Sequence, residues 1–375
     1  MTLQQIDVVG LPQPGRIRAA RDLRQLTQQE TVDRMSRPIT GAALSQIEAG
    51  KVRPTEGTLR QLAAALDVPV GFFSAQWPDS ATGDVLSHVT YFRDLAATPA
   101  KLRRRAAALA LLLSDLVSAI ELHVRIPEVR IPSFPVEPGA SREEIDDVAE
   151  ALRGEWDLGE EPIPHVVREI ERRGVPVARL AIGTTAVDAF SVRFNRRPII
   201  LLTDDKSSYV RSRFDAAHEL GHLVMHGDAD AQDRSIERQA HDLASSLLLP
   251  RNVALLELPR RLDAAGWARL AEVKRHWGLS MSALLYRARD LQLMTPEVYR
   301  NGMKYMSARG WRTNEPGDRE MGPPEAPALF EQSLRRVSIE GNHSTEALIA
   351  SANLPLADTL ALIHAAVDAR PRIDL

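Results

Sequence analysis

The sequence predicts a multidomain protein with an all-α N-terminal domain, an α+β middle domain and a helical C-terminal extension. Residues 15–73 contain five short helical patterns separated by capping and turn residues. Three β-like runs, at 175–182, 189–194 and 198–202, lie between helical segments further along the chain. With 375 residues, the chain is long enough for two or three domains with sizeable cores.

We expect four regions, at residues 1–78, 79–140, 141–255 and 256–375. The second is a linker with a long helix, because prolines at 127, 132, 135 and 138 interrupt regular structure after a helical pattern at 101–124. The third holds the β-like runs, and the fourth is helical, with a polar stretch at 314–327. Further helices are expected at 142–156, 163–173, 208–226, 236–249, 268–277 and 282–291.

The N-terminal region carries the start and stop signals of a small helical bundle. Thr27 and Glu30 form a capping box that begins a second helix, Thr40 can cap a third, and Gly50 ends it. The expected helices cover 16–26, 27–35, 41–49, 59–66 and 70–73. A helix, a tight turn and a second short helix inside a compact bundle is the helix-turn-helix plan.

Composition excludes several kinds of protein. The chain has no cysteine, which excludes disulfides, thiolate metal sites and a cysteine nucleophile. The longest apolar run, near 109–113, is too short to span a bilayer, and no export signal is visible. We therefore expect a cytoplasmic protein that does not engage a membrane. Its net charge of −3 means that any nucleic-acid surface must be local.

Residues 218–222 carry the clearest chemical signal, His-Glu-Leu-Gly-His. On a helix, positions i and i+4 share one face, so His218 and His222 can bind one metal ion. Glu219 lies beside them, where a general base for peptide hydrolysis is needed. The alternative is a polar cluster satisfied by hydrogen bonds alone, within a helix that is otherwise apolar and mostly buried.

A catalytic zinc has three protein ligands and a water, so a third ligand is required. The candidates on the next helix are Glu237, His241 and Asp242. Zn2+ is the expected ion, although Mn2+ or Fe2+ could occupy a site of two histidines and one carboxylate. His226 lies one turn beyond the motif, and we expect it at the rim, beside a ligand or on the surface. No oxyanion donor is identified, since Tyr209, Arg211 and Arg213 are expected to be structural.

The motif and the residues after it resemble the IrrE/ImmA family of zinc-dependent peptidases (M78/DUF955-like). The family pattern, an H-E-x-G-H helix, a further His, an E-x-x-A segment and a Leu-Leu-x-Pro stretch, recurs at 218–222, 226, 237–244 and 247–250. The resemblance implies a zincin-like metallopeptidase domain with Glu237 as third ligand. His241 stands where the family more often has Asn, and it could orient a ligand or alter the metal.

Residues 44–54, Leu-Ser-Gln-Ile-Glu-Ala-Gly-Lys-Val-Arg-Pro, resemble the Xre (phage repressor Cro/C1-type) helix-turn-helix family. In that family the third helix enters the major groove of double-stranded DNA. The residues then expected to face bases are Thr40, Ala42, Ala43 and Gln46, and those expected at phosphates are Gln28 and Lys51 or Arg53. The alternatives are a solvated surface or a domain that docks a protein. A homodimer would fit binding to two half-sites, but no interface is evident.

Two further stretches resemble longer members of the peptidase family. The points of similarity are Phe92-Arg93, the segment 277–288 and Glu315-Pro316. Helices that merely complete the fold would explain these points equally well.

Together the two resemblances imply a DNA-binding regulatory zinc metallo-endopeptidase. It would cleave a protein, expected to be a helix-turn-helix repressor, after a stress or mobile-element signal. The alternative is an Xre-type transcription regulator whose metal domain senses a ligand or binds a partner without turnover. The substrate and operator are not encoded in any residue pattern.

Overall fold

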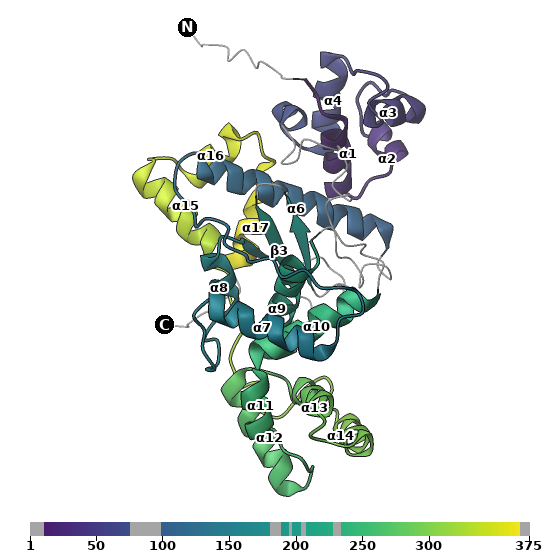
Figure 1. Cartoon of the computed structure of the whole chain (residues 1–375). Helices are drawn as coiled ribbons and strands as arrows, with labels where there is room; N and C mark the ends of the chain where they lie inside the picture. The colour runs from purple at the N-terminus through teal and green to yellow at the C-terminus, as the bar shows by residue number, and fades with distance from the viewer. Residues whose placement is uncertain are drawn as a thin grey trace.

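The computed structural model describes residues 11–75, 99–180, 189–194, 197–203, 208–227 and 234–367. The Phe92-Arg93 similarity lies outside these residues. Figure 1 shows a small helical domain at one end, a sheet in the middle, and a group of helices at the other end. This is the multidomain arrangement that the sequence predicted, with an all-α N-terminal domain, an α+β middle part and a helical C-terminal part.

The N-terminal domain contains the five expected helical segments. They are α1 (Pro14–Leu23), α2 (Gln28–Asp33), α3 (Gly41–Glu48), α4 (Glu56–Leu66) and the 3-10 helix η1 (Val70–Ser74). The predicted capping box is present, because the Thr27 side chain accepts from Glu30 N and the Glu30 side chain accepts from Thr27 N. Gly50 follows α3 with φ of 70°, the left-handed conformation that favours glycine.

A three-stranded sheet lies at the centre of the molecule. It contains β1 (Val177–Leu180), β2 (Ala189–Arg193) and β3 (Pro198–Thr203) in the order β1-β3-β2, with β1 parallel and β2 antiparallel to β3. Every residue of β3 is buried, as expected for a central strand covered on both faces. Ile199 and Leu201 belong to one hydrophobic core, and Ile200 and Leu202 to the other, so the pleat of β3 divides the two cores.

The first core joins the N-terminal domain to one face of the sheet through α6 (Ala100–Glu121). Two ion pairs reinforce this junction. Arg16 of α1 pairs with Asp115 of α6, with 2.9 Å between Nη2 and Oδ1, and its side chain is fully buried. Arg24 follows α1 and pairs with Asp358 of α17 (Leu356–Val367) at 2.7 and 2.8 Å. The N-terminal domain therefore packs directly against α6 and α17.

The second core lies between the other face of the sheet and the helices around the site. It includes α7 (Arg142–Glu155), α8 (Val166–Arg172), α9 (Tyr209–Met225) and α10 (Arg234–Leu248). The remaining helices are α11 (Arg251–Glu257), α12 (Ala264–Trp277), α13 (Met281–Asp290), α14 (Pro296–Ala308), α15 (Leu329–Glu340) and α16 (Thr345–Ser351). The sequence reasoning missed α11 and α14, each of which starts at or directly after a proline.

Residues 125–140, the proline-rich segment, contain no helix or strand, as the prolines predict. The segment is nevertheless bonded to the body of the protein. Phe134 N donates to Val224 O of α9 at 2.9 Å, and Arg130 N donates to Arg173 O at 2.9 Å. These main-chain bonds hold the segment beside the C-terminal ends of α8 and α9.

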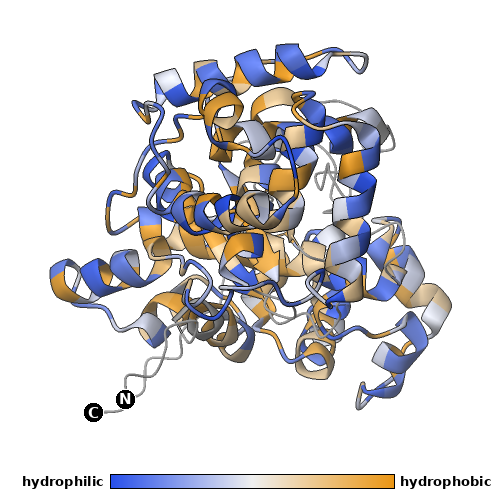
Figure 2. Cartoon of the chain, turned by 90° about the horizontal axis from the view of Figure 1, so that it is seen from below, coloured by the Kyte–Doolittle hydropathy of each residue, from blue (hydrophilic) through white to orange (hydrophobic). Residues whose placement is uncertain are grey.

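Hydrophilic and hydrophobic residues alternate along the peripheral helices in Figure 2, the pattern of helices with one solvated face. None of the helices in the described parts of the chain combines the length and apolar character that crossing a membrane requires.

Candidate metal centre

Helix α9 carries the His-Glu-x-x-His segment between the sheet and α10. The Ser208 side chain caps it by accepting from Arg211 N at 3.3 Å. Gly221 allows α10 to pack closely, because a Cβ there would lie 3.1 Å from Leu243 Cδ2 and 3.3 Å from Ala240 Cα. A larger residue at 221 would push α10, and with it the side chains that α10 directs to the site, away from α9.

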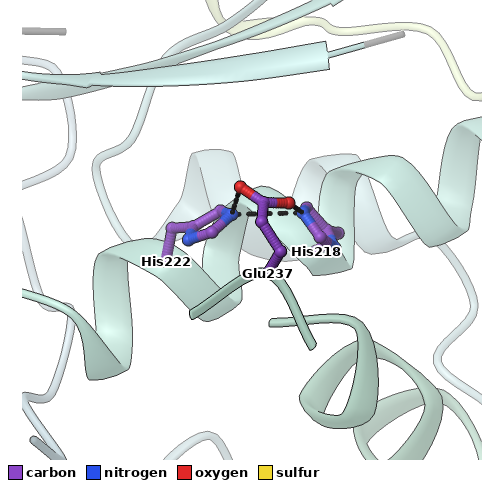
Figure 3. A group of neighbouring side chains, drawn as sticks. All are labelled: His218, His222 and Glu237. Atoms are coloured by element: carbon purple, nitrogen blue, oxygen red, sulfur yellow. Dashed lines mark hydrogen bonds and ion pairs between the residues drawn. The ribbon is translucent and has the colours of Figure 1, made fainter. Parts of the chain in front are cut away.

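His218, His222 and Glu237 form the centre of the site (Figure 3). The Nε2 atoms of the two histidines are 3.1 Å apart, and the carboxylate oxygens of Glu237 lie 3.4 Å from His218 Nε2 and 3.6 Å from His222 Nε2. Bonds of about 2.1 Å in tetrahedral geometry place two ligand atoms about 3.4 Å apart. The three donors therefore fit one tetrahedral ion such as zinc, with the fourth position left to a water.

The two histidines differ in their surroundings. Burial lowers the pKa of His222 well below its usual value, and the charges of His218 and His226 lower it further. Burial also lowers the pKa of His218, but the hydrogen bond to Glu237 and the charge of Glu219 outweigh it and raise that pKa. His222 is only 1% exposed, whereas the His218 side chain is 20% exposed and faces the cavity.

His226 and Gln239 lie behind His222 and away from the cavity lining. His226 Nδ1 is 3.1 Å from His222 Nδ1, and His226 Nε2 is 3.1 Å from Gln239 Oε1. Gln239 Nε2 in turn donates to the carbonyl oxygens of Glu137 and Pro138 at 2.7 and 3.3 Å. His226 is thus buried beside His222 and lies neither at the rim of the cavity nor on the surface.

Glu219 is buried next to the donor cluster. Its Oε2 has no hydrogen-bond partner among the described residues. Burial raises the pKa of Glu219 to about 7, while the charge of His218 and the nearby hydroxyl of Ser191 on β2 oppose the rise. A carboxyl group with a pKa near neutrality can both take up and release a proton at the reaction site.

A cavity of about 1000 Å³ opens from this cluster. Beside the cluster its wall is aromatic: the His241 ring lies 4.8 Å from the ring of Phe214 and 5.0 Å from the ring of Tyr286, measured between centroids. Tyr299 and Met303 of α14 extend this wall. The aromatic wall, defined as these five residues, provides an apolar surface next to the donor cluster.

The other sequence candidates near the centre lie apart from the three donors. Asp242 is ion-paired with Arg142 at 2.9 Å, so its carboxylate is engaged away from the cluster. Arg213 is buried and bonded to Glu325, the structural role that was expected. His241 lines the cavity, and the cluster of donor atoms does not include it.

The sequence reasoning missed Gln239, Ser191 and Tyr286 as parts of this site. Each is distant in sequence from the motif or lacks a characteristic spacing, so no local pattern identifies it. Tyr286 and Arg211 both line the cavity.

The positions expected to read DNA lie on and around α3, at the end of the molecule opposite α11–α14 (Figure 1). The exposed positions are Thr40, Ala42, Gln46, Lys51 and Arg53. Ala43 is half-buried, and its N–H bonds the Thr40 hydroxyl at 3.1 Å, so Thr40 caps α3. Gln28 donates to Glu48 Oε2 at 2.8 Å and so also links α2 to α3.

Comparison with known families matches both parts of the chain. Residues 17–73 match the helix-turn-helix family model, and residues 170–289 match the model of the IrrE N-terminal-like domain of the M78 peptidases. The second match spans all three strands, the helices α9–α12 and all but the last residue of α13, with the three donor residues inside it. No curated protein matches the chain.

Proposed function

Because the chain joins a helix-turn-helix domain to an IrrE N-terminal-like peptidase domain, we propose that it is a DNA-binding regulator that works as a zinc-dependent metallo-endopeptidase. The observation that carries the proposal is the placement of three metal donors, His218, His222 and Glu237, beside the buried Glu219 at the base of a cavity. Manganese or iron would be accepted by the same donor set. We place the protein in the cytoplasm, where its DNA and its substrate would be found.

Each residue has a defined part in hydrolysis of a peptide bond. Zinc held by the three donors would lower the pKa of a water molecule and polarise the scissile carbonyl. Glu219 accepts the proton of the attacking water and passes it to the leaving amine. Burial of Glu219 favours its protonated form, so the residue can hold that proton until the amine leaves.

The cavity supports a peptide substrate. The aromatic wall lies next to the donor cluster and can bury one apolar side chain of an extended segment. We propose a protein substrate, with a helix-turn-helix repressor as the expected class. His241 belongs to this wall, so its role is to contact substrate rather than to bind metal.

DNA binding is assigned to α3 and the turn after it. Ala42, Gln46, Lys51 and Arg53 are exposed there, and Gln46 can pair bidentately with adenine. The net charge of the chain is −3, so attraction to phosphate would come from this local surface.

The decisive experiment is Glu219→Gln, compared with wild type and with Glu272→Gln, an exposed position on α12. Each protein is co-expressed with a panel of helix-turn-helix repressors, and new N-termini are identified by mass spectrometry. Zinc content is measured in parallel by elemental analysis. We expect Glu219→Gln to retain zinc and to lose cleavage, while Glu272→Gln cleaves normally.

A regulator that uses its metal domain only to sense a ligand or hold a partner would behave differently. Wild type would then produce no new N-termini, and Glu219→Gln would leave gene regulation unchanged. Wild type that binds no zinc when zinc is supplied would contradict both uses of the metal centre.

A further inference from the structure

The side chains behind His222 form a chain of hydrogen bonds that ends at two backbone carbonyl groups. Because these carbonyls can only accept, they determine which atom donates at every other bond of the chain. We propose that His226 and Gln239 are positioning residues that hold His222 in the tautomer with its proton on Nδ1, which leaves the Nε2 lone pair directed at the metal position. This inference rests on the metal centre of the proposed function. It is independent of the reaction and of the substrate.

The fixed end lies on the proline-rich segment. Two carbonyl oxygens, of Glu137 and Pro138, face the Gln239 amide at 2.7 and 3.3 Å. Carbonyl oxygens only accept hydrogen bonds, so the amide atom facing them must be the NH2 group. The amide oxygen of Gln239 then faces His226, and it can only accept.

The direction passes from Gln239 to His226. Because Gln239 Oε1 accepts, the His226 nitrogen 3.1 Å away must carry a proton, and that nitrogen is Nε2. A neutral imidazole has one N–H, so Nδ1 of His226 carries a lone pair. A second proton on Nδ1 would make a cation of a side chain that is 3% exposed, at the cost of desolvating a charge.

The last hydrogen bond of the chain joins His226 to His222, whose other nitrogen faces the metal position. His226 Nδ1 faces His222 Nδ1 at 3.1 Å and accepts, so His222 donates from Nδ1. The other nitrogen of His222, Nε2, then has its lone pair in the cluster, 3.6 Å from Glu237 Oε1 and 3.1 Å from His218 Nε2. Without this chain the imidazole of His222 would divide its population between two tautomers, one of which cannot bind a metal through Nε2.

The chain also fixes the orientation of the ring. Its five members come from the C-terminal end of α9, from α10 and from the proline-rich segment, and that segment is held to α9 by the bond from Phe134 N to Val224 O. Partners of this kind commonly change metal affinity by about 10–100-fold when they are removed. We expect zinc affinity to fall by a factor in that range when these hydrogen bonds no longer fix the tautomer of His222.

Variants of similar size distinguish the effect of hydrogen-bond direction from the effect of side-chain packing. Gln239→Met removes the acceptor, whereas Gln239→Glu keeps an oxygen facing His226 and, when protonated, a donor facing the carbonyls. His226→Leu removes both functions, whereas His226→Gln can accept from His222 and donate to Gln239. All four are made in the full chain, and their melting temperatures are compared with wild type to identify any that fail to fold.

Two readouts test the chain of bonds. The first is the zinc dissociation constant, by competition with a chromophoric chelator. The second is the tautomer of His222 in the metal-free protein, by 15N–1H correlation spectra of 15N-histidine-labelled chain, assigned with His222→Ala. We expect Nδ1–H for His222 in wild type, Gln239→Glu and His226→Gln. Gln239→Met and His226→Leu should show a mixture and bind zinc about 10–100-fold more weakly.

A His222 proton on Nε2 in metal-free wild type would overturn the proposal. So would a folded Gln239→Met protein with the wild-type tautomer and wild-type zinc affinity. Both outcomes are measured without substrate. A protein that binds zinc with the expected tautomer but cleaves nothing would contradict the proposed function and leave this inference standing.

Discussion

Glu171 caps the helix that begins at Leu329. Its carboxylate accepts the backbone N–H groups of Ala328 and Leu329 at 2.9 and 3.1 Å, although Glu171 lies on α8, more than 150 residues earlier in the sequence. Ala328 has no side-chain oxygen and cannot cap α15 itself. The C-terminal helices are therefore tied to the body by a carboxylate that supplies the missing cap.

The burial of this carboxylate predicts a dependence of stability on pH. Burial raises the pKa of Glu171 to about 7, although the two N–H groups oppose the rise. Between the pKa of Glu171 in the unfolded chain and pH 7, Glu171 keeps its proton in the folded protein and releases it in the unfolded chain. The contribution of Glu171 to the free energy of unfolding therefore decreases as pH rises through this window, by up to about 3 kcal/mol.

The measurement compares thermal unfolding of wild type and Glu171→Gln between pH 5 and pH 8. The stability of wild type relative to the variant should fall across this range. A difference that stays constant with pH would contradict the prediction.

The pair between Arg16 and Asp115 is expected to stabilise the junction of the two parts of the protein. Asp115→Ala removes the Asp115 carboxylate from a fully buried guanidinium, and we expect the free energy of unfolding to fall by about 3 kcal/mol. The measurement is the melting transition by calorimetry. The control is Glu340→Ala, which breaks the exposed pair with Arg336 and should change the transition little. Equal effects of the two variants would show that burial does not matter here.

The proposed DNA recognition by α3 and the turn after it predicts different effects for Gln46 and Lys51. Once an operator is selected from random DNA, Gln46→Ala should weaken its binding by about 1–3 kcal/mol and leave binding to unrelated DNA unchanged. Lys51→Ala should weaken both and reduce the slope of log affinity against log salt by about 1. Lys304→Ala, on α14 far from α3, is the control. Unchanged affinity and slope in both test variants would exclude this surface.

The metal donors predict a simple pattern of zinc content. Wild type should hold about one zinc per chain, and Glu237→Ala should hold almost none. His241→Ala should keep its zinc, because His241 lies between Phe214 and Tyr286 and outside the donor cluster. Elemental analysis of proteins purified without chelators checks this. Loss of zinc in His241→Ala with retention in Glu237→Ala would reverse the assignment.

Local sequence signals predicted much of the fold. The capping box at Thr27 and Glu30 and the glycine at 50 predicted the starts and ends of the N-terminal helices to within a few residues. The three β-like runs became the three strands of the sheet, and within the described residues the ends differ by one or two residues. Such signals act over one turn of helix or one strand, which is why the sequence alone can contain them.

Features that depend on tertiary contact could not be predicted in this way. The order β1-β3-β2, the bond from Gln239 to the carbonyl of Glu137, and the cap that Glu171 gives to α15 all join residues far apart in the chain. The His-Glu-x-x-His spacing predicted two donors on one face of a helix. Only the close packing of α9 on α10 at Gly221 brings Glu237 to them.

The shared core between α1 and α6 has a consequence for how this architecture can change. Ile17 and Ala20 of α1 and Leu112 of α6 belong to the same hydrophobic core as the sheet. Replacing the N-terminal domain, up to residue 99, with a foreign domain would therefore expose apolar surface of α6. It would also remove Arg16, the ion-pair partner of Asp115. Substitutions at exposed positions of α3 such as Gln46 would leave this shared core intact.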